Sequence, residues 1–125
     1  MSVQVSVKNK AHIDVEGCDE VITFDSNEVE STYLNIEVKK SASCIWAVRG
    51  KNLTYCTDVT NMSAKAVADA KFNDTLDLGL QYVDGSFTID GVTAVPQIAG
   101  QQLSYTIPQI NMNQTVKICF QVKVL

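Results

Sequence analysis

The fold class is decided by the stretch Val116-Lys117-Ile118-Cys119-Phe120-Gln121-Val122-Lys123-Val124, close to the end of the sequence. Apolar residues occupy every second position, and polar residues or a cysteine fill the positions between them. A period of two is typical of a β-strand with one buried face, because successive side chains point to opposite sides of the sheet. Shorter stretches with the same alternation occur at residues 3–7, 34–38, 53–59 and 103–107. The sequence therefore predicts an all-β fold.

Turn signals separate these stretches. Four residue pairs that end in glycine favour tight turns between strands: Arg49-Gly50, Asp84-Gly85, Asp90-Gly91 and Ala99-Gly100. Residues 63–71 are rich in alanine, but the alanines alternate and lack helical spacing, so a strand or loop is predicted there. Short strands at this spacing favour a β-sandwich.

The charge and hydropathy of the chain argue against two classes of function. Its 125 residues carry a net charge of −4 without a basic stripe that could neutralise phosphates, so nucleic-acid binding is not expected. No apolar run approaches the roughly 18 residues that a membrane span needs, and the alternating start is unlike a signal peptide. We expect a soluble domain, reaching a surface either through a signal that has been removed or by deposition on a spore.

The first third of the chain differs from the rest. Residues 1–33 hold many of the acidic side chains and alternate more weakly than residues 34–125. We therefore expect an amino-terminal arm or extra strands at residues 1–33 and an immunoglobulin-like domain at residues 34–125. In the arm, Val3, Val5 and Val7 are predicted to form a strand that pairs with a sheet edge, because unpaired edges accept added strands. These three valines are candidate interface residues.

A long series of motifs in residues 34–125 has a recognisable order. The segments are Lys39-Lys40-Ser41-Ala42-Ser43, Gly50-Lys51-Asn52-Leu53-Thr54-Tyr55, Val59-Thr60-Asn61-Met62-Ser63, Asp74-Thr75-Leu76 and Gly79-Leu80-Gln81-Tyr82-Val83-Asp84-Gly85-Ser86, followed by the final alternating strand. In this order and spacing the chain resembles the bacterial surface-repeat family called domain of unknown function eleven. Asp77 stands where the family has proline, and Asn113 where it has glycine, and both suit turns.

The resemblance implies an immunoglobulin-like sandwich of about seven strands. Members of this family occur in cell-surface proteins and in spore appendages of anaerobic bacteria. The resemblance thus implies a location on a bacterial cell surface or spore surface, while function still has to be argued from the residues.

Residues that could carry chemistry are few. His12 is the one histidine, and the chain has no Gly-x-Ser-x-Gly elbow, so a catalytic triad is not expected. Four aspartates could suggest a calcium site, namely Asp74, Asp77, Asp84 and Asp90. They lack the Asp-x-Asp-x-Asp spacing of calcium-binding loops. We predict no enzyme activity, no cofactor and no metal site.

The cysteines are more informative. The four cysteines, Cys18, Cys44, Cys56 and Cys119, lack the close pairs of a zinc site, which leaves disulfides or free thiols. Disulfides are expected, with three possible connectivities. If a turn centres on Gly50, antiparallel pairing places Cys44 opposite Cys56. A Cys44–Cys56 bridge then leaves Cys18 and Cys119 to link the arm to the last strand, preferentially of another subunit.

The same register has consequences for the neighbouring residues. It places Ile45 opposite Tyr55 and Ala47 opposite Leu53 on the inner face, and it directs Trp46 outward. An outward tryptophan is a common interface anchor, so Trp46 is a candidate interface residue.

Two functions remain open at this stage. The first is a structural subunit that assembles into a homo-oligomer or fibre on a bacterial surface by strand addition and disulfides, with other surface proteins as further possible partners. The alternative is an adhesion or carbohydrate-binding module that uses Trp46, Tyr33 or Tyr82 as stacking platforms.

Overall fold

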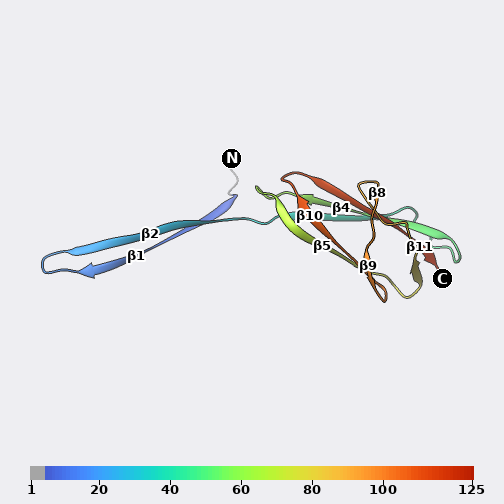
Figure 1. Cartoon of the computed structure of the whole chain (residues 1–125), viewed down its shortest axis with the longest axis horizontal. Coiled ribbons are helices and arrows are strands. Elements are labelled where there is room, and N and C mark those ends of the chain that lie inside the picture. Colours follow the sequence, from blue (N-terminus) through green and yellow to red (C-terminus); the bar gives the residue numbers. More distant parts are fainter. Residues whose placement is uncertain (1–4) are drawn as a thin grey trace. The chain divides into compact units, whose positions relative to one another are not determined.

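The computed structural model describes residues 5–125, and every regular element within them is a β-strand (Figure 1). The predicted all-β fold is confirmed. Val3 lies outside the described residues. The chain divides into two compact units, Met1–Leu34 and Asn35–Leu125, which are described separately below.

The first unit is a β-hairpin. Strands β1 (Ser6–Glu16) and β2 (Val21–Thr32) pair antiparallel as a two-stranded sheet. The tip, residues 17–20, is closed by the Gly17 amide, which donates to the Glu20 carbonyl at 2.7 Å. At the open end the Tyr33 amide donates to the Val5 carbonyl at 3.0 Å, so Val5 continues the ladder just before β1. Val7 lies within β1.

The second unit is a sandwich of two antiparallel sheets. One sheet has the order β3-β4-β11-β7-β8, with β6 also pairing with β11, and the other has the order β5-β10-β9. The bounds are β3 (Ile36–Ala42), β4 (Asn52–Asn61), β5 (Val67–Thr75), β6 (Leu80–Tyr82), β7 (Thr88–Ile89), β8 (Val92–Thr93), β9 (Gln97–Ala99), β10 (Gln102–Ile110) and β11 (Thr115–Val124). Residues 35–125 thus form nine strands instead of about seven, and four of them, β6 to β9, are strands of two or three residues in the stretch between β5 and β10. The immunoglobulin-like identity of this sandwich stays a prediction.

The core lies between the two sheets and explains why they pack. All five apolar residues of the deciding stretch are at most 8% exposed: Val116, Ile118, Phe120, Val122 and Val124. They meet Leu103, Ile107 and Ile110 of the opposite sheet in one hydrophobic cluster. Burial of each such side chain contributes about 1.5–3 kcal/mol.

Aromatic rings fill the centre of this core. Phe120 and Phe87 are 0% exposed, and their ring centroids lie 6.3 Å apart. Tyr55 and Tyr82 pack against Phe120 at 6.0 and 6.3 Å. Tyr82 is therefore part of the packing and is not a free stacking platform.

A predicted turn joins β7 to β8. Ile89 pairs with Val92, and the two residues between them, Asp90 and Gly91, have φ values of 50° and 82°. Positive φ at both positions is the requirement of a two-residue hairpin turn, which Asp-Gly meets with little strain. The alanine-rich segment is also a strand in part, since β5 begins at Val67.

A turn forms at Arg49-Gly50 as predicted, with the Lys51 amide donating to the Val48 carbonyl at 3.0 Å and Gly50 at a φ of 81°, but the strand register expected around it is wrong. Strands β3 and β4 pair with Ala42 opposite Tyr55 and Val38 opposite Val59, and residues 43–51 form a loop. A register with Cys44 opposite Cys56 would turn the charged face of β3 toward the core. The reason is that shifting a strand by an odd number of residues exchanges its two faces. The observed register instead points Ile36 inward. Ile45, expected to face the core, is 91% exposed in the loop.

Candidate functional site

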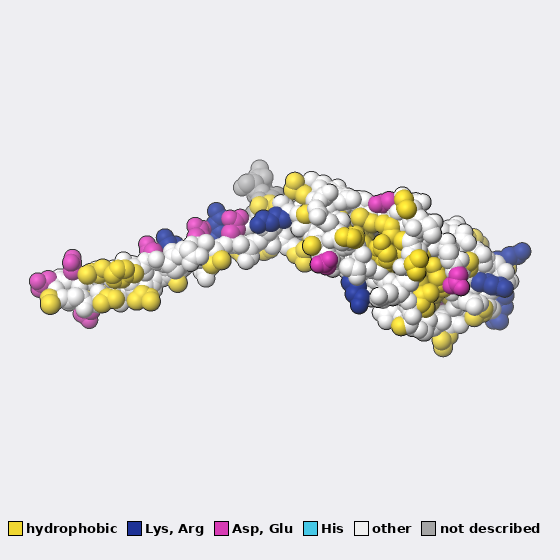
Figure 2. Space-filling view, in the orientation of Figure 1, with side chains coloured by type: hydrophobic (Ala, Val, Ile, Leu, Met, Phe, Trp, Pro, Cys, Tyr) yellow, Lys and Arg dark blue, Asp and Glu magenta, His cyan; other side chains and the backbone are white. Residues whose placement is uncertain are grey.

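The hairpin carries an apolar face that nothing within it covers. Cross-strand partners share a face, so Ile13 lies beside Phe24 and Val15 beside Ile22 near the tip. Six side chains make up this apolar face, and their exposed fractions lie between 42% and 69%: Val7, Ile13, Val15, Ile22, Phe24 and Val29. Figure 2 shows hydrophobic side chains gathered toward the hairpin tip. Soluble proteins rarely leave a continuous apolar strip of this kind without a partner.

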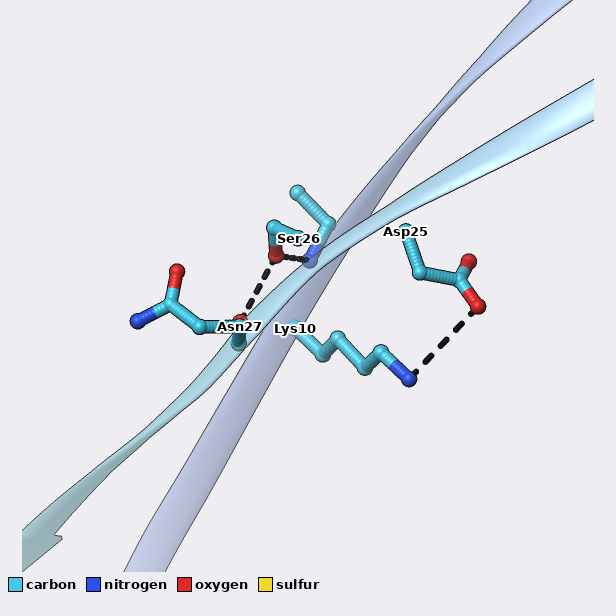
Figure 3. A network of polar contacts seen from close by, with 5 residues as sticks. Lys10, Asp25, Ser26 and Asn27 are labelled. Atoms are coloured by element: carbon cyan, nitrogen blue, oxygen red, sulfur yellow. Dashed lines mark hydrogen bonds and ion pairs between the residues drawn. The ribbon is translucent and has the colours of Figure 1, made fainter.

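A β-bulge keeps this face continuous. Lys10 pairs with Glu28 but His12 pairs with Asp25, so β2 has one extra residue between these pairs. The Ser26 hydroxyl accepts a hydrogen bond from the Ala11 amide at 2.9 Å and donates one to the Asn27 carbonyl at 2.7 Å (Figure 3).

The extra residue changes the parity of β2. On the tip side of the bulge the apolar face takes even-numbered residues of β2, such as Phe24, and beyond the bulge it takes odd-numbered ones, such as Val29. If β2 kept all its residues but paired regularly, without the bulge, Glu28 and Glu30 would lie on the apolar face. The bulge therefore separates an apolar face from a charged face along the whole hairpin.

The opposite face of the hairpin is charged. Lys8 stands opposite Glu30 and Lys10 opposite Glu28, and Lys10 Nζ also lies 3.6 Å from Asp25 (Figure 3). Its apolar member is Val21, which is 61% exposed. Exposed pairs of this kind add little stability, so the charged face contributes little to holding the hairpin together.

The sandwich unit carries a complementary feature, a groove of about 470 Å³ between the edge strands β3 and β5. Ile36 and Val38 of β3 line one wall, and Ala70 and Phe72 of β5 line the other. The floor is formed by inward-facing residues of β4 and β10, namely Thr57, Val59 and Ile107. Val38 is 62% exposed although it points to the inner side of its sheet.

An ion pair closes one end of this groove. Lys40 Nζ of β3 lies 2.6 Å from Asp74 Oδ2 of β5, and the two side chains are 44% and 11% exposed. The ammonium also stands 4.7 Å from the Tyr55 ring centroid, a cation–π distance. The pair joins the two sheets at the point where the groove ends.

The floor of the groove holds an unsatisfied polar group. The Thr57 side chain is buried, at 3% exposure, and its hydroxyl has no hydrogen-bond partner among residues 5–125. Such a group costs about 1–3 kcal/mol in a folded protein.

The outer face of β3 differs from its inner face. Glu37 and Lys39 form an ion pair at 2.9 Å on the outer side. The hydrogen bond from Lys39 to Glu37, followed by the charge of that carboxylate, raises the pKa of Lys39. The ammonium therefore keeps its charge, and charged side chains on an edge strand discourage unspecific pairing.

The disulfide connectivity differs from the expectation. Cys56 of β4 is bonded to Cys119 of β11, its direct cross-strand neighbour, with the two Cα atoms 4.1 Å apart. The predicted Cys44–Cys56 and Cys18–Cys119 bridges are wrong, because the observed register places Cys44 beyond the end of β3. Cys18, at the hairpin tip, and Cys44, in the loop, are exposed free thiols.

Trp46 lies in the same loop as Cys44. It is 73% exposed, beside the still more exposed Ile45, so it is outward as predicted but sits on a loop instead of a strand. Its amide donates to Cys44 Sγ at 3.4 Å.

The remaining candidate residues have local partners. His12 Nε2 lies 3.6 Å from Asp14 on the hairpin, Asp77 accepts from the Gly79 amide at 2.8 Å, and Asp90 accepts from the Lys117 amide at 2.8 Å. In the described part of the chain no three His, Cys, Asp or Glu side chains gather as a metal site would require. Within residues 5–125 no helix has the length and apolarity to cross a membrane.

Sequence reasoning missed both the full apolar face and the groove. A signal for the face existed, because Val5 and, within β1, Val7, Ala11, Ile13 and Val15 all occupy odd-numbered positions. The bulge concealed its continuation in β2. The groove depends on which strands lie at the edges of the two sheets, and a local sequence pattern does not encode the order of strands in a sheet.

Comparison with family models, curated proteins and solved structures finds no match to this chain. The resemblance to the surface-repeat family stays a prediction.

Proposed function

We propose that this chain is a structural subunit that assembles with copies of itself on a bacterial cell or spore surface, through strand addition and disulfides. The observation that carries the proposal is the apolar face of the hairpin. Two-stranded hairpins are marginally stable in water unless their apolar side packs on something, so this hairpin is suited to an assembled state. Other surface proteins are further candidate partners.

The cysteines support an oxidising surface location. The Cys56–Cys119 disulfide ties the two central strands of the larger sheet, and such bonds persist outside the reducing cytosol. The exposed thiols of Cys18 and Cys44 lie in different units and can join neighbouring copies. As that S–S bond forms, the two thiols lose two protons and two electrons to an oxidant such as molecular oxygen, which becomes hydrogen peroxide.

The proposal is tested by negative-stain electron microscopy and light scattering of the full chain, with and without reductant. We expect oligomers or fibres that lose covalent linkage but not all association when reduced. Removing residues 1–34 should give a monomer with an unchanged thermal transition, since the sandwich core lies in residues 35–125. A full chain that stays monomeric at all concentrations contradicts the proposal.

A second candidate function is adhesion to carbohydrate, favoured by the exposure of Trp46. A tryptophan that is 73% exposed can stack on a sugar ring, and Tyr33 is 50% exposed. Titration with surface polysaccharides, followed by tryptophan fluorescence, tests this candidate. Saturable quenching that Trp46→Ala abolishes supports adhesion, and the absence of any response to the sugars contradicts it.

A further inference from the structure

One of the two sheets of the sandwich lacks a strand opposite β3. The sheet β5-β10-β9 ends at β5, while the facing sheet continues to β3, whose inner side chains Ile36 and Val38 line the open groove. One more strand beside β5 would lie above β3 and cover these residues, because stacked sheets pack about 10 Å apart with interleaved side chains. The groove is the space that such a strand would fill.

We propose that the hairpin of a second copy of this chain fills this groove, by pairing β2 with the free edge of β5. The inference rests on the proposed function and names the two surfaces that meet. The hairpin supplies an uncovered apolar face, and the groove supplies uncovered apolar walls. Since one chain carries both surfaces in different units, each copy can receive one hairpin and donate another, which gives a head-to-tail array.

The dimensions of the strands match. Strand β2 has 12 residues and β5 has nine, so β2 can run along the whole edge. Residues of β5 that face the groove alternate as Ala70, Phe72 and Asp74, and a paired strand presents its inner residues in the same repeat. The apolar face of the hairpin then continues the inner surface of the sheet, and the charged face stays in solvent.

The charges also match. Lys71 is an exposed cation on the outer side of β5, at the rim of the groove. The outer side of an added β2 is acidic, with Asp25, Glu28 and Glu30 on the charged face. Pairs between Lys71 and these acidic side chains favour this arrangement over pairing between two hairpin edges of like charge, and the exposed Asp69, nearer the start of β5, is the one like charge on that side of β5.

The direction of docking follows from the antiparallel pairing that every sheet of this molecule uses. An antiparallel β2 begins next to the end of β5, where the Lys40–Asp74 pair closes the groove. The hairpin tip with Cys18 then comes to the side where β3 ends and the loop with Cys44 begins. The two free thiols are thereby brought to the same end of the interface.

The test uses two full-length variants, each with one surface blocked. Phe24→Glu puts a charge on the apolar face, and Val38→Glu puts one in the groove. Both side chains are more than 60% exposed, so the monomer should fold. Matched controls are Val21→Glu on the charged face and Val92→Glu on β8, away from the groove. Ala70→Glu blocks the facing wall and serves as a second groove variant.

Sedimentation velocity under reducing conditions measures the association. We expect Phe24→Glu, Val38→Glu and Ala70→Glu each to weaken association by about tenfold or more, and the two controls to behave like the wild type. An equimolar mixture of Phe24→Glu and Val38→Glu should form a 1:1 heterodimer and stop there, because the mixture contains one intact hairpin and one intact groove per pair.

The other outcomes separate the two proposals. If Phe24→Glu dissociates while both groove variants assemble like the wild type, the hairpin binds elsewhere, and the groove proposal is overturned while the proposed function stands. If the mixture yields no heterodimer, the groove proposal is likewise overturned. A wild-type chain that stays monomeric, including one whose hairpin fills its own groove, overturns both.

Discussion

The hairpin and the sandwich are built from strands with the same alternation, yet their apolar side chains have opposite surroundings. In β11 the inward residues are at most 8% exposed, whereas the apolar face of the hairpin is 42–69% exposed. Alternation decides which side of a strand is apolar, and it leaves open what covers that side. The sandwich covers its strands with a second sheet, whereas nothing within the hairpin covers its apolar face. Assembly and folding are therefore expected to be separable in this chain.

The largest difference between the two units is expected when one phenylalanine is truncated in each of them. Phe120→Ala should lower the free energy of unfolding of the sandwich by about 3–5 kcal/mol, because it leaves a cavity at the centre of the core. Phe24→Ala should change it by less than about 0.5 kcal/mol, since Phe24 is 61% exposed on the hairpin. Urea unfolding followed by circular dichroism measures both. Equal losses from the two variants would mean that the units are not independent.

The cysteines give the next largest contrast. The double variant Cys56→Ser with Cys119→Ser should cost the sandwich about 2–4 kcal/mol, because the bond closes a loop with a sequence separation of 63 residues. Cys18→Ser and Cys44→Ser should leave the unfolding free energy unchanged and remove covalent multimers. Thermal melts and non-reducing electrophoresis check both effects. Peptide mapping that joins Cys56 to Cys44 would contradict the connectivity.

The sequence predicted the sandwich better than the hairpin, and the reason is physical. Each long strand of the sandwich buries one face, so the alternation from Val116 to Val124 follows the packing directly. The register between β3 and β4 differs from the predicted one because packing of Ile36 against the core, and not the glycine turn, sets the pairing. In the observed register Val38 pairs with Val59, which directs both Ile36 and Val38 inward.

The candidate surfaces could be predicted only in part. Val5 and Val7 lie in the hairpin ladder as an extended segment, but the strand that pairs with them is β2 of the same unit. The extra residue at Ser26 and Asn27 interrupts the period of two, so the sequence of β2 looks irregular. The groove arises because one sheet extends one strand further than the sheet that faces it. This is a property of the topology that the local alternation of residues does not predict.

A smaller effect is expected from the unsatisfied hydroxyl beneath the groove. Thr57→Val should raise the free energy of unfolding by about 1 kcal/mol, because a methyl group replaces a buried hydroxyl without a partner. Thr60→Val on the same strand is the control, since Thr60 Oγ1 is hydrogen-bonded to Thr115 Oγ1 at 2.8 Å and should give no gain. Destabilisation by Thr57→Val would show that the hydroxyl has a partner in solution.

The smallest effect on stability should come from the bulge. Deleting Asn27 should leave the thermal transition of the sandwich unchanged, because the hairpin is a separate unit. The deletion takes out the extra residue of β2, so Lys10 still pairs with Glu28, His12 still pairs with Asp25, and Val29 stays on the apolar face. Association should therefore stay within about twofold of the wild type, which sedimentation velocity measures. A loss of about tenfold after the deletion would show that the bulge itself takes part in the contact.

Hydrogen exchange of the backbone amides, followed by mass spectrometry over a range of protein concentrations, tests the separation of the two units most directly. Amides of β4, β10 and β11 should be protected at every concentration, because their hydrogen bonds lie in the closed sandwich. Amides of β1 and β2 should exchange rapidly in the dilute monomer and become protected as the chain assembles. Hairpin amides that are equally protected at all concentrations, or that stay unprotected in the assembled state, would contradict a hairpin that is stabilised by a second copy.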